Sequence, residues 1–348
     1  MKKIVYIFVF LTVCSSAFSQ DTQFSQFYAA PMYHNPAFTG SGYAPRLILN
    51  YRNQWPSLAA NYTTSAISVD HYLDRFNSGI GIMVVNDEQG FGRLKNTEIS
   101  GFYSYQLNLV DDHFLRMGVQ GTYSNRSFDT AGLTFPDQFD NGGFTGNPSN
   151  DPLFNFSGGA NFADFSTGVL YYNPKFYLGA SMHHIAQPDL TFTSSATNGQ
   201  ISDVLPRKIM VNGGLNIPLG DLGFNNSGGL KEFAIYPAFL YKQQGKFSQL
   251  DLGAFVTYSP MTVGLWYRGI PLKKNGTNSP NNDAIVALAG FRFDNFSFGY
   301  SYDITISGLG STTGGSHEIS IAYQFDAFES ERSPSAKRRK KELSCPKF

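Results

Sequence analysis

Apolar and polar residues alternate along most of this chain. From Phe296 to Ile304 the aromatic and aliphatic residues occupy one parity, while serine, glycine and aspartate occupy the other. The segment from Glu318 to Phe325 repeats the pattern. Because successive side chains of a strand point to opposite faces of a sheet, both segments are predicted to be β-strands. Long patterns rich in Leu, Ala, Glu and Lys, which would indicate helices, are few.

Runs of this kind predict about fourteen strands. They are expected at residues 46–54, 60–71, 79–86, 95–107, 113–126, 164–172, 176–184, 206–217, 231–243, 246–258, 261–269, 283–293, 296–306 and 315–325. Many match the ~9–11 residues that a tilted strand needs to cross a bilayer. We therefore predict an all-β protein whose residues 46–325 form an up-and-down, antiparallel transmembrane β-barrel with its apolar face toward lipid. The alternative is a secreted β-sandwich, which would bury that face.

Composition agrees with a large β-structure. Charged residues make up 15% of the chain and aromatic residues 16%, with 35 glycines, whereas an ordinary soluble domain is about 25% charged. The mean hydropathy of -0.21 excludes a bundle of apolar membrane helices. Lys and Arg together number 26, as do Asp and Glu. No bulk positive field is therefore present to hold nucleic acid, and no nucleic-acid partner is expected.

The chain begins with a predicted signal peptide at residues 1–19. Two lysines precede an apolar run at residues 4–13, and Ala17 and Ser19 are placed for cleavage before Gln20. The run is too short to span a bilayer as a helix, which needs about 20 residues. Cleavage would leave Cys345 as a single cysteine, so no internal disulfide is expected.

The lengths of the links between strands predict an orientation. Short links at 173–174, 259–260 and 294–295 are expected in the periplasm, and longer links are expected outside the cell. The longer links are residues 127–163, 185–205, 270–282 and 307–314. Two links break this rule, a long inner one at 218–230 and a short outer one at 243–246. Both chain ends, the N-terminal segment 20–45 and the tail 326–348, are predicted to be periplasmic.

The C-terminal tail is basic. Residues 326–348 carry seven basic and four acidic side chains, a net charge of +3, and the basic run includes Arg338 and Lys340. Pro334 and the charge run favour an extended, solvated segment. Two interpretations remain open: a docking tail for a periplasmic partner or anionic headgroups, and a disordered, soluble end.

Several motifs in a fixed order resemble a known family. They are the run from Asn35 and Pro36 to Gly40, the stretch Tyr51–Pro56 that contains Trp55, the stretch Tyr300-Ser-Tyr302-Asp303, the run Ser316–Ser320 around Glu318, and the terminal Cys345–Phe348. Together they resemble the PorP/SprF family of type IX secretion system outer-membrane proteins of Bacteroidetes-type bacteria.

The resemblance implies an outer-membrane barrel that works with a secretion and gliding apparatus. It implies a role in the export or surface attachment of proteins with a type-B C-terminal sorting domain, including large adhesins. Outer-membrane lipids, periplasmic secretion components and cargo proteins are the implied partners. No cofactor is implied.

The N-terminal segment is predicted to be irregular. Pro36 disfavours a helical conformation at Asn35, and Gly40 and Gly42 permit turns. Residues 31–45 are therefore expected to fold back before the first strand. They would either plug the lumen, as in the long-chain fatty-acid channels, or form a periplasmic collar.

Strand parity also predicts a cluster of charges. Arg52, Asp303 and Glu318 all fall on the polar, inward parity. Pairing the last two strands across their link places Asp303 about opposite Glu318, and closure of the barrel brings the first strand beside the last. Two facing carboxylates need a cation between them, and the planar fork of an arginine can bridge them. The cluster would serve either as a closure clamp or as a substrate contact.

Signals for catalysis are weak. No phosphate-binding loop, dinucleotide fingerprint or nucleophile elbow occurs. His183 and His184 are adjacent in an expected strand, so they should face opposite sides and could not share a metal. We therefore expect a non-enzymatic secretion component without cofactor or metal. The alternatives are a channel for small hydrophobic molecules, resembling the long-chain fatty-acid transporters, and an enzyme carried by a barrel.

Overall fold

The computed structural model describes ten segments of the 348-residue chain. They are residues 21–90, 94–110, 112–128, 133–140, 142–150, 159–190, 204–224, 230–274, 280–308 and 310–326. The predicted signal peptide and the basic tail with Arg338, Lys340 and Cys345 lie outside the described residues. Within the described part of the chain, no helix is long and apolar enough to span a bilayer.

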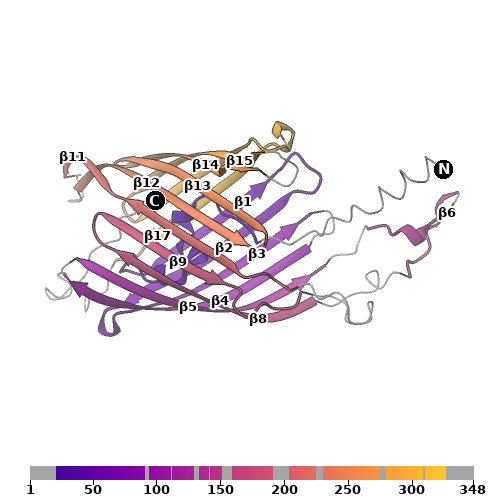
Figure 1. Cartoon of the computed structure of the whole chain (residues 1–348), viewed down its shortest axis with the longest axis horizontal. Helices are drawn as coiled ribbons and strands as arrows, with labels where there is room; N and C mark the ends of the chain where they lie inside the picture. The colour runs from indigo at the N-terminus through magenta and orange to yellow at the C-terminus, as the bar shows by residue number, and fades with distance from the viewer. Residues whose placement is uncertain are drawn as a thin grey trace.

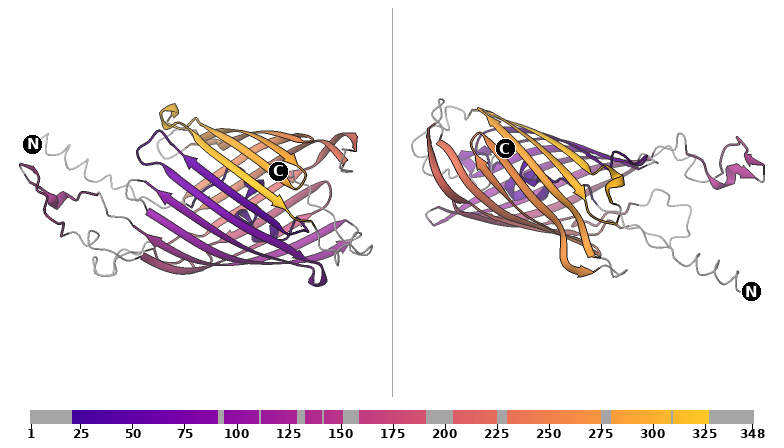
Figure 2. Two further views of the ribbon diagram at one scale, coloured as in Figure 1. Left: turned by 180° about the vertical axis from the view of Figure 1, so that it is seen from behind. Right: turned by 90° about the horizontal axis from the view of Figure 1, so that it is seen from above.

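Fourteen antiparallel strands close into a barrel (Figure 1). The spatial order is β10-β9-β8-β5-β4-β3-β2-β1-β17-β16-β15-β14-β13-β12, and pairing of β10 with β12 completes the ring. Figure 2 shows from two further sides how the tilted strands enclose the interior. The strands are β1 (Arg46–Gln54), β2 (Tyr62–Leu73), β3 (Ser78–Gln89), β4 (Leu94–Val110), β5 (His113–Ser127), β8 (Gly159–Tyr172), β9 (Phe176–His183), β10 (Lys208–Leu215), β12 (Leu230–Gln244), β13 (Phe247–Tyr258), β14 (Met261–Lys274), β15 (Pro280–Phe293), β16 (Phe296–Thr305) and β17 (Ser316–Gln324).

The two faces of each strand differ as the alternation predicts. Along β16, Phe298 is exposed, whereas Ser301 and Asp303 are buried. Exposed aromatic and aliphatic side chains recur on the outer face of the other strands, including Ile67 of β2 and Leu265 of β14. A soluble sandwich would bury these side chains, whereas a membrane barrel turns them toward lipid. The predicted transmembrane barrel is therefore confirmed.

Two of the expected links contain further strands. The predicted inner link 218–230 overlaps β11 (Ile217–Phe224), which continues the direction of β10 and pairs with the first half of β12. The pairing of β9 with β10 ends at Phe176 and Leu215, so β11 extends this hairpin past β9. The long link 127–163 holds a small hairpin of β6 (Phe139–Asp140) and β7 (Gly143–Phe144), and β8 begins within it.

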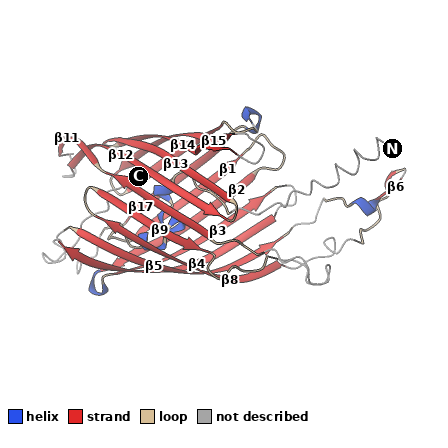
Figure 3. Ribbon diagram, in the orientation of Figure 1, coloured by secondary structure: helices blue, strands red, loops and turns tan. Residues whose placement is uncertain are grey.

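The N-terminal segment, residues 21–45, runs through the interior of the barrel. It contains the short helices η1 (Phe27–Ala29), α2 (Pro31–His34) and η2 (Pro36–Phe38), which Figure 3 shows inside the strands. Three further short helices lie in links, namely η3 (Asp74–Phe76), η4 (Pro136–Gln138) and η5 (Gly310–Thr313). A segment that starts at one mouth and ends where β1 begins must cross the lumen.

The ends of the described chain lie at opposite mouths of the barrel. Asp21 donates its backbone N–H to Gln244, the last residue of β12. Pro45 accepts a hydrogen bond from the N–H of Phe325, which follows β17 at the other mouth. The prediction that both ends face the periplasm is therefore wrong for this part of the chain. Parity and link lengths do not report the path of a segment that precedes the first strand.

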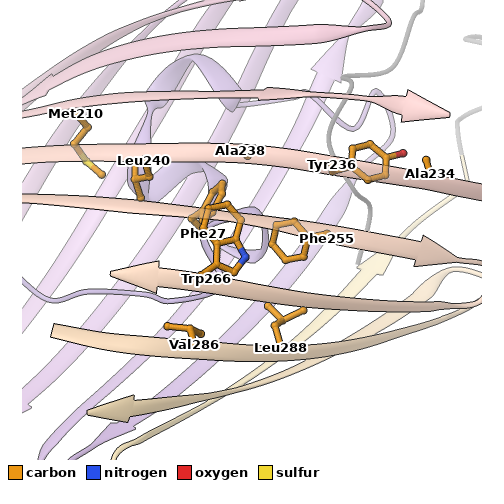
Figure 4. Close-up of a cluster of buried hydrophobic side chains, with 10 residues drawn as sticks. All are labelled: Phe27, Met210, Ala234, Tyr236, Ala238, Leu240, Phe255, Trp266, Val286 and Leu288. Carbon is orange, nitrogen blue, oxygen red and sulfur yellow. The ribbon is translucent and has the colours of Figure 1, made fainter. Parts of the chain in front are cut away.

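Apolar contacts fix the segment against the barrel wall. Phe27 meets Trp266 of β14 edge to face at 4.8 Å and Phe255 of β13 at 6.4 Å (Figure 4). Met32 packs with inward side chains of β2, β3 and β4, and Phe38 with those of β5, β8 and β9. The interior core of the barrel is thus shared between the wall and the N-terminal segment.

The N-terminal segment and the buried ion network

Asn35 and Pro36 occupy a seat formed by glycines of the wall. The Asn35 side chain is fully buried, and its amide nitrogen donates to the backbone oxygens of Val169 at 3.1 Å and Ala180 at 3.3 Å. Its oxygen accepts from the N–H of Ala37 at 2.9 Å. A Cβ atom on Gly168 would overlap the Asn35 oxygen, and one on Gly118 or Gly179 would meet the same stretch of the segment. These glycines permit the close approach.

Gly40 makes the turn that leads out of the lumen. Its φ of +72° lies in the left-handed region that glycine adopts at little cost. Its N–H donates to Asp70 Oδ2 at 2.7 Å, and the same carboxylate pairs with Arg46 at 2.9 Å. An added Cβ would stand 2.8 Å from the Cα of Gly79. Side chains larger than hydrogen are therefore excluded here by space and by conformation.

Arg52 lies between the two acids that the sequence singles out. Its Nη2 is 2.8 Å from Asp303 Oδ2, and its Nη1 is 3.2 Å from Glu318 Oε2. All three side chains are buried, at 3%, 2% and 0% exposure. The structure therefore brings these residues together across the seam between β1 and β17, where Arg52 is the direct partner of Glu318.

The expected register of the last hairpin is wrong by two residues. Asp303 lies opposite Ser316, and Glu318 lies opposite Ser301. The link contains η5 and ends at Gly315, so the strands do not pair symmetrically about it. A shift of two residues keeps the side chains on the same face. The acids consequently remain inward but are diagonal neighbours.

Arg268 of β14 is a fourth member of the network that sequence reasoning missed. Its Nη1 is 2.8 Å from Asp303 Oδ2, and its Nε is 3.4 Å from Asp251 Oδ1. Arg268 has the same strand parity as the buried Trp266, and this parity could have predicted that Arg268 faces inward. Sequence alone could not place β14 close enough to β16, because β15 separates the two strands.

The N-terminal segment completes this network. Ser25 Oγ accepts from Arg52 at 2.7 Å and from Arg268 at 2.8 Å, and it donates to Asp303 at 2.7 Å. The backbone N–H groups of Ser25 and Gln26 donate to the two oxygens of Glu318 at 2.6 and 3.1 Å. Buried charges are tolerated when they are paired and hydrogen-bonded. The network therefore fixes the segment to the wall as well as joining the first and last strands. Its members are already bonded to one another, which suits a structural clamp better than proton transfer.

A second set of charges holds the start of the N-terminal segment, around Asp21. Asp21 pairs with Lys208, and its Oδ1 accepts from Gln244 Nε2 at 2.9 Å. His184 lies 2.7 Å from both Asp21 Oδ2 and Asp164 Oδ2. We call Asp21, its partners Lys208, Gln244 and His184, and Asp164 behind His184 the Asp21 clamp.

The carboxylates of the clamp keep His184 protonated. Burial lowers the pKa of the His184 imidazole, but Asp21 and Asp164 outweigh this and raise it to about 9. Burial raises the pKa of the Asp21 carboxyl, but His184 and Lys208 hold it well below its usual range. The clamp is therefore ionised on both sides at neutral pH.

The prediction that His183 and His184 face opposite sides is wrong. His183 ends β9 and its Nε2 lies 3.1 Å from the backbone oxygen of His34. His184 has left the strand with a φ of 58°, which turns its side chain into the lumen as well. Parity applies only inside a strand. Within the described residues, no group of three or more His, Cys, Asp or Glu could hold a metal ion.

Three other residues of the family motifs lie apart from the network. Trp55 follows β1 with a φ of 59°, and its N–H donates to the Gly315 oxygen at 2.8 Å. Tyr300 is on the outer face, with its hydroxyl 2.8 Å from His317 Nδ1. Tyr302 reaches the Gly314 oxygen at 3.4 Å. These contacts fasten the link between β16 and β17 to the ends of β1, β16 and β17.

The segment divides the remaining space of the lumen. A cavity of about 310 Å³ lies at the mouth that holds Asp21, between the segment and the wall from β12 to β17. A smaller one of about 60 Å³ lies on the other side of Asp21. A third, of about 80 Å³, lies beside Phe27, Phe38 and Arg46 and extends toward the opposite mouth.

A family model now decides the identity of the chain. The model, described as Type IX secretion system membrane protein PorP/SprF, matches residues 16–323. The chain belongs to the PorP/SprF family. The predicted family is thereby confirmed, and with the barrel fold it makes this an outer-membrane component of the type IX secretion system. Family and fold are those of a secretion component or channel.

The other comparisons give only distant likenesses. No curated protein matches this PorP/SprF member. The toluene transporter TodX of P. putida is 10% identical at a TM-score of 0.47, over 84% of this chain and 93% of its own. A FadL homologue of Pseudomonas aeruginosa is 11% identical at 0.45, over 86% and 94%. A mutant Rh. blastica porin is 8% identical at 0.32, over 81% and 99%. At TM-scores under 0.5 these likenesses carry no argument about function.

Proposed function

We propose that this PorP/SprF member is a non-enzymatic barrel that supports the export or cell-surface attachment of proteins carrying a type-B C-terminal sorting domain, in secretion and gliding. Family membership supports the secretion role. The observation that favours a plugged barrel over an open channel is the ion network between the N-terminal segment and the wall. Ser25 bonds both Arg52 and Arg268 there.

The segment acts as a plug in this proposal. Breaking one partner of a buried ion pair costs about 3–5 kcal/mol, and the segment is also held by the glycine seat and the Asp21 clamp. A barrel that passes solutes continuously would have to displace all three attachments. A barrel that binds partner proteins at its two mouths can keep all three attachments in place.

The ends then meet different partners. Cargo, or another outer component, is expected at the mouth that holds Asp21, where the long links lie. Periplasmic secretion components are expected at the mouth where Pro45 meets Phe325, from which the basic tail continues. The outer face of exposed aromatic and aliphatic side chains is expected to contact outer-membrane lipids.

The alternative function is a channel for small hydrophobic molecules. It would favour a continuous apolar tunnel. The three lumenal cavities described above lie on different sides of the segment, and the largest of these three is lined by charged side chains such as Lys242 and Asp283. The plugged docking role is therefore the better supported of the two.

The experiment compares cells that lack the gene with cells that carry the full chain, a variant without residues 326–348, or a variant without residues 127–158. Secreted cargo, surface-attached cargo and co-purifying partners are measured in each, and purified barrels are tested for conductance in planar bilayers. We expect loss of attached cargo without the gene, loss of partners without the tail, and a low conductance for the full chain. Normal export and attachment in all strains, or a steady open conductance, would overturn the proposal.

A further inference from the structure

The largest of the three lumenal cavities described above is a vestibule at the mouth that holds Asp21. Its volume of about 310 Å³ falls within the range of small-ligand sites, about 300–1,000 Å³. Charged and amide side chains dominate one side of it, including Lys242, Gln249, Asn281, Asn282 and Asp283. Trp55 and Tyr33 add aromatic surface. We call this cavity the outer vestibule.

The Asp21 clamp shows what kind of group this mouth binds. One carboxylate, that of Asp21, is held by the ammonium of Lys208 and by the amide of Gln244, at 2.9 Å from Nε2. The lysine and the glutamine come from the two neighbouring strands β10 and β12, and they are register partners. A lysine facing a glutamine across two strands therefore binds a carboxylate in this barrel.

A lysine facing a glutamine recurs in the outer vestibule, where Gln249 Nε2 donates to Asp251 Oδ1 at 2.7 Å but no carboxylate pairs with the lysine among the described residues. Lys242 precedes Gln244 by two residues on the same face of β12, and its register partner on β13 is Gln249. Both line the vestibule. Within the described residues, the half-buried Lys242 ammonium makes no ion pair or hydrogen bond. A half-buried cation is stabilised by an anion that approaches it.

The surroundings of Lys242 select among anions. The planar fork of arginine binds carboxylates and phosphates through two-point contacts, and the forks of Arg52 and Arg268 are already bonded to Asp303. The Lys242 ammonium is a single point charge that either anion can approach, so the neighbouring charges decide which anion is favoured. Asp283, 45% exposed on the same wall, repels a second negative charge and can accept a hydrogen bond.

We propose that the outer vestibule binds an extended peptide that carries one carboxylate side chain, with that carboxylate on Lys242. Gln249 and Asn281 use their amide nitrogens on Asp251 and Ser248 and keep an acceptor oxygen. Asn282 accepts from Tyr267 and keeps a donor nitrogen, so the three amides together offer the donors and acceptors that a peptide backbone requires. Trp55 and Tyr33 provide apolar surface for a neighbouring side chain. This inference goes beyond the proposed function and does not depend on it, because binding is measured on the isolated barrel.

The test uses the full mature chain in detergent and a fluorescent, end-blocked pentapeptide with one glutamate. A matched peptide carries glutamine in its place, and binding is followed by fluorescence anisotropy. The substitution Lys242→Gln is expected to weaken binding of the glutamate peptide by roughly tenfold or more. The glutamine peptide should bind the wild type about as weakly as the glutamate peptide binds Lys242→Gln. The substitution Lys242→Gln should not weaken binding of the glutamine peptide further.

Lys175→Gln is the matched control, because Lys175 is exposed at the opposite mouth. Lys175→Gln should leave the affinity for the glutamate peptide unchanged. Lys242→Arg, which keeps the positive charge, should retain most of the wild-type affinity. Asp283→Asn, which removes the repelling charge, should tighten binding and provides a second readout if Lys242→Gln does not fold. Equal affinities of the two peptides for the wild type would overturn the proposal. So would competition by inorganic phosphate at the concentration at which acetate competes.

Discussion

Arg52 and Glu318 face each other across the seam where the first and last barrel strands pair, with Nη1 3.2 Å from Oε2. The same guanidinium reaches Asp303 and Ser25, so one side chain joins β1, β16, β17 and the N-terminal segment. Residues more than 250 positions apart in the sequence thereby depend on one another.

Arg52→Ala is expected to lower the free energy of unfolding by about 3–5 kcal/mol, because it leaves Glu318 and Asp303 with less compensation in a buried site. Urea unfolding of the detergent-solubilised barrel, followed by its mobility on unheated gels, measures the change. Arg292→Ala removes an exposed arginine of β15 and should stay within about 0.5 kcal/mol of the wild type. Equal losses in both variants would contradict a special role for the seam.

Gly168→Ala is expected to dislodge the N-terminal segment while the barrel stays closed. The added methyl group would overlap the Asn35 oxygen, and overpacking of this kind costs about 1–3 kcal/mol. Limited proteolysis between residues 21 and 45 should become faster, without loss of heat-modifiable gel mobility. In Gly101→Ala the new atom has nothing within 4 Å, and proteolysis should match the wild type. Unchanged protection in Gly168→Ala would refute the tight seat.

The Asp21 clamp is expected to weaken at high pH. The pKa of His184 is raised in the folded state to about 9, so its stabilising contribution is complete below the unfolded pKa of about 6.5 and is lost as the pH rises through about 9. A shift of this size corresponds to on the order of 3 kcal/mol. The stability difference between the wild type and His184→Asn should therefore be large at pH 6 and small at pH 10. A difference that does not depend on pH would rule out the ion pair.

The same clamp has an acid limit of opposite sign. The pKa of Asp21 is lowered in the folded state, so its contribution is present above the unfolded value of about 3.9 and is lost as the pH falls through the folded value. Asp21→Asn should therefore cost stability at pH 6, and this cost should shrink progressively as the pH falls below about 3.9. The measurement is the urea midpoint as a function of pH, with Asp140→Asn, in the hairpin of β6 and β7, as the control. A cost that persists at low pH would point to packing instead of charge.

Leu265→Arg tests the membrane-facing surface. Leu265 lies within β14 and is 62% exposed, so the arginine would enter hydrocarbon and cost about 2–4 kcal/mol in a bilayer. Leu58→Arg, in the link after β1, should cost about 1 kcal/mol or less. Folding equilibria in lipid vesicles give both values. Similar small costs in the two variants would mean that Leu265 faces water.

The sequence by itself determined the strands, their faces and the inward placement of the charges. Alternation is a property of neighbouring residues, because the backbone of a strand turns each side chain away from the previous one. Arg52, Asp303 and Glu318 were therefore placed inward from parity, and the expected strand pairing and barrel closure grouped them. A two-residue error in the register of β16 and β17 did not matter, since the period of a strand is two.

Only the tertiary structure decided what meets in the lumen. Arg268 joins the network because barrel curvature brings β14 within reach of β16, and Ser25 joins because the N-terminal segment crosses the interior to β1. The path of that segment depends on glycines of β5, β8 and β9, which are distant in the sequence. His184 turns inward once it leaves β9. Contacts of this kind arise from the closure of the sheet and the packing of its interior, which no local pattern encodes.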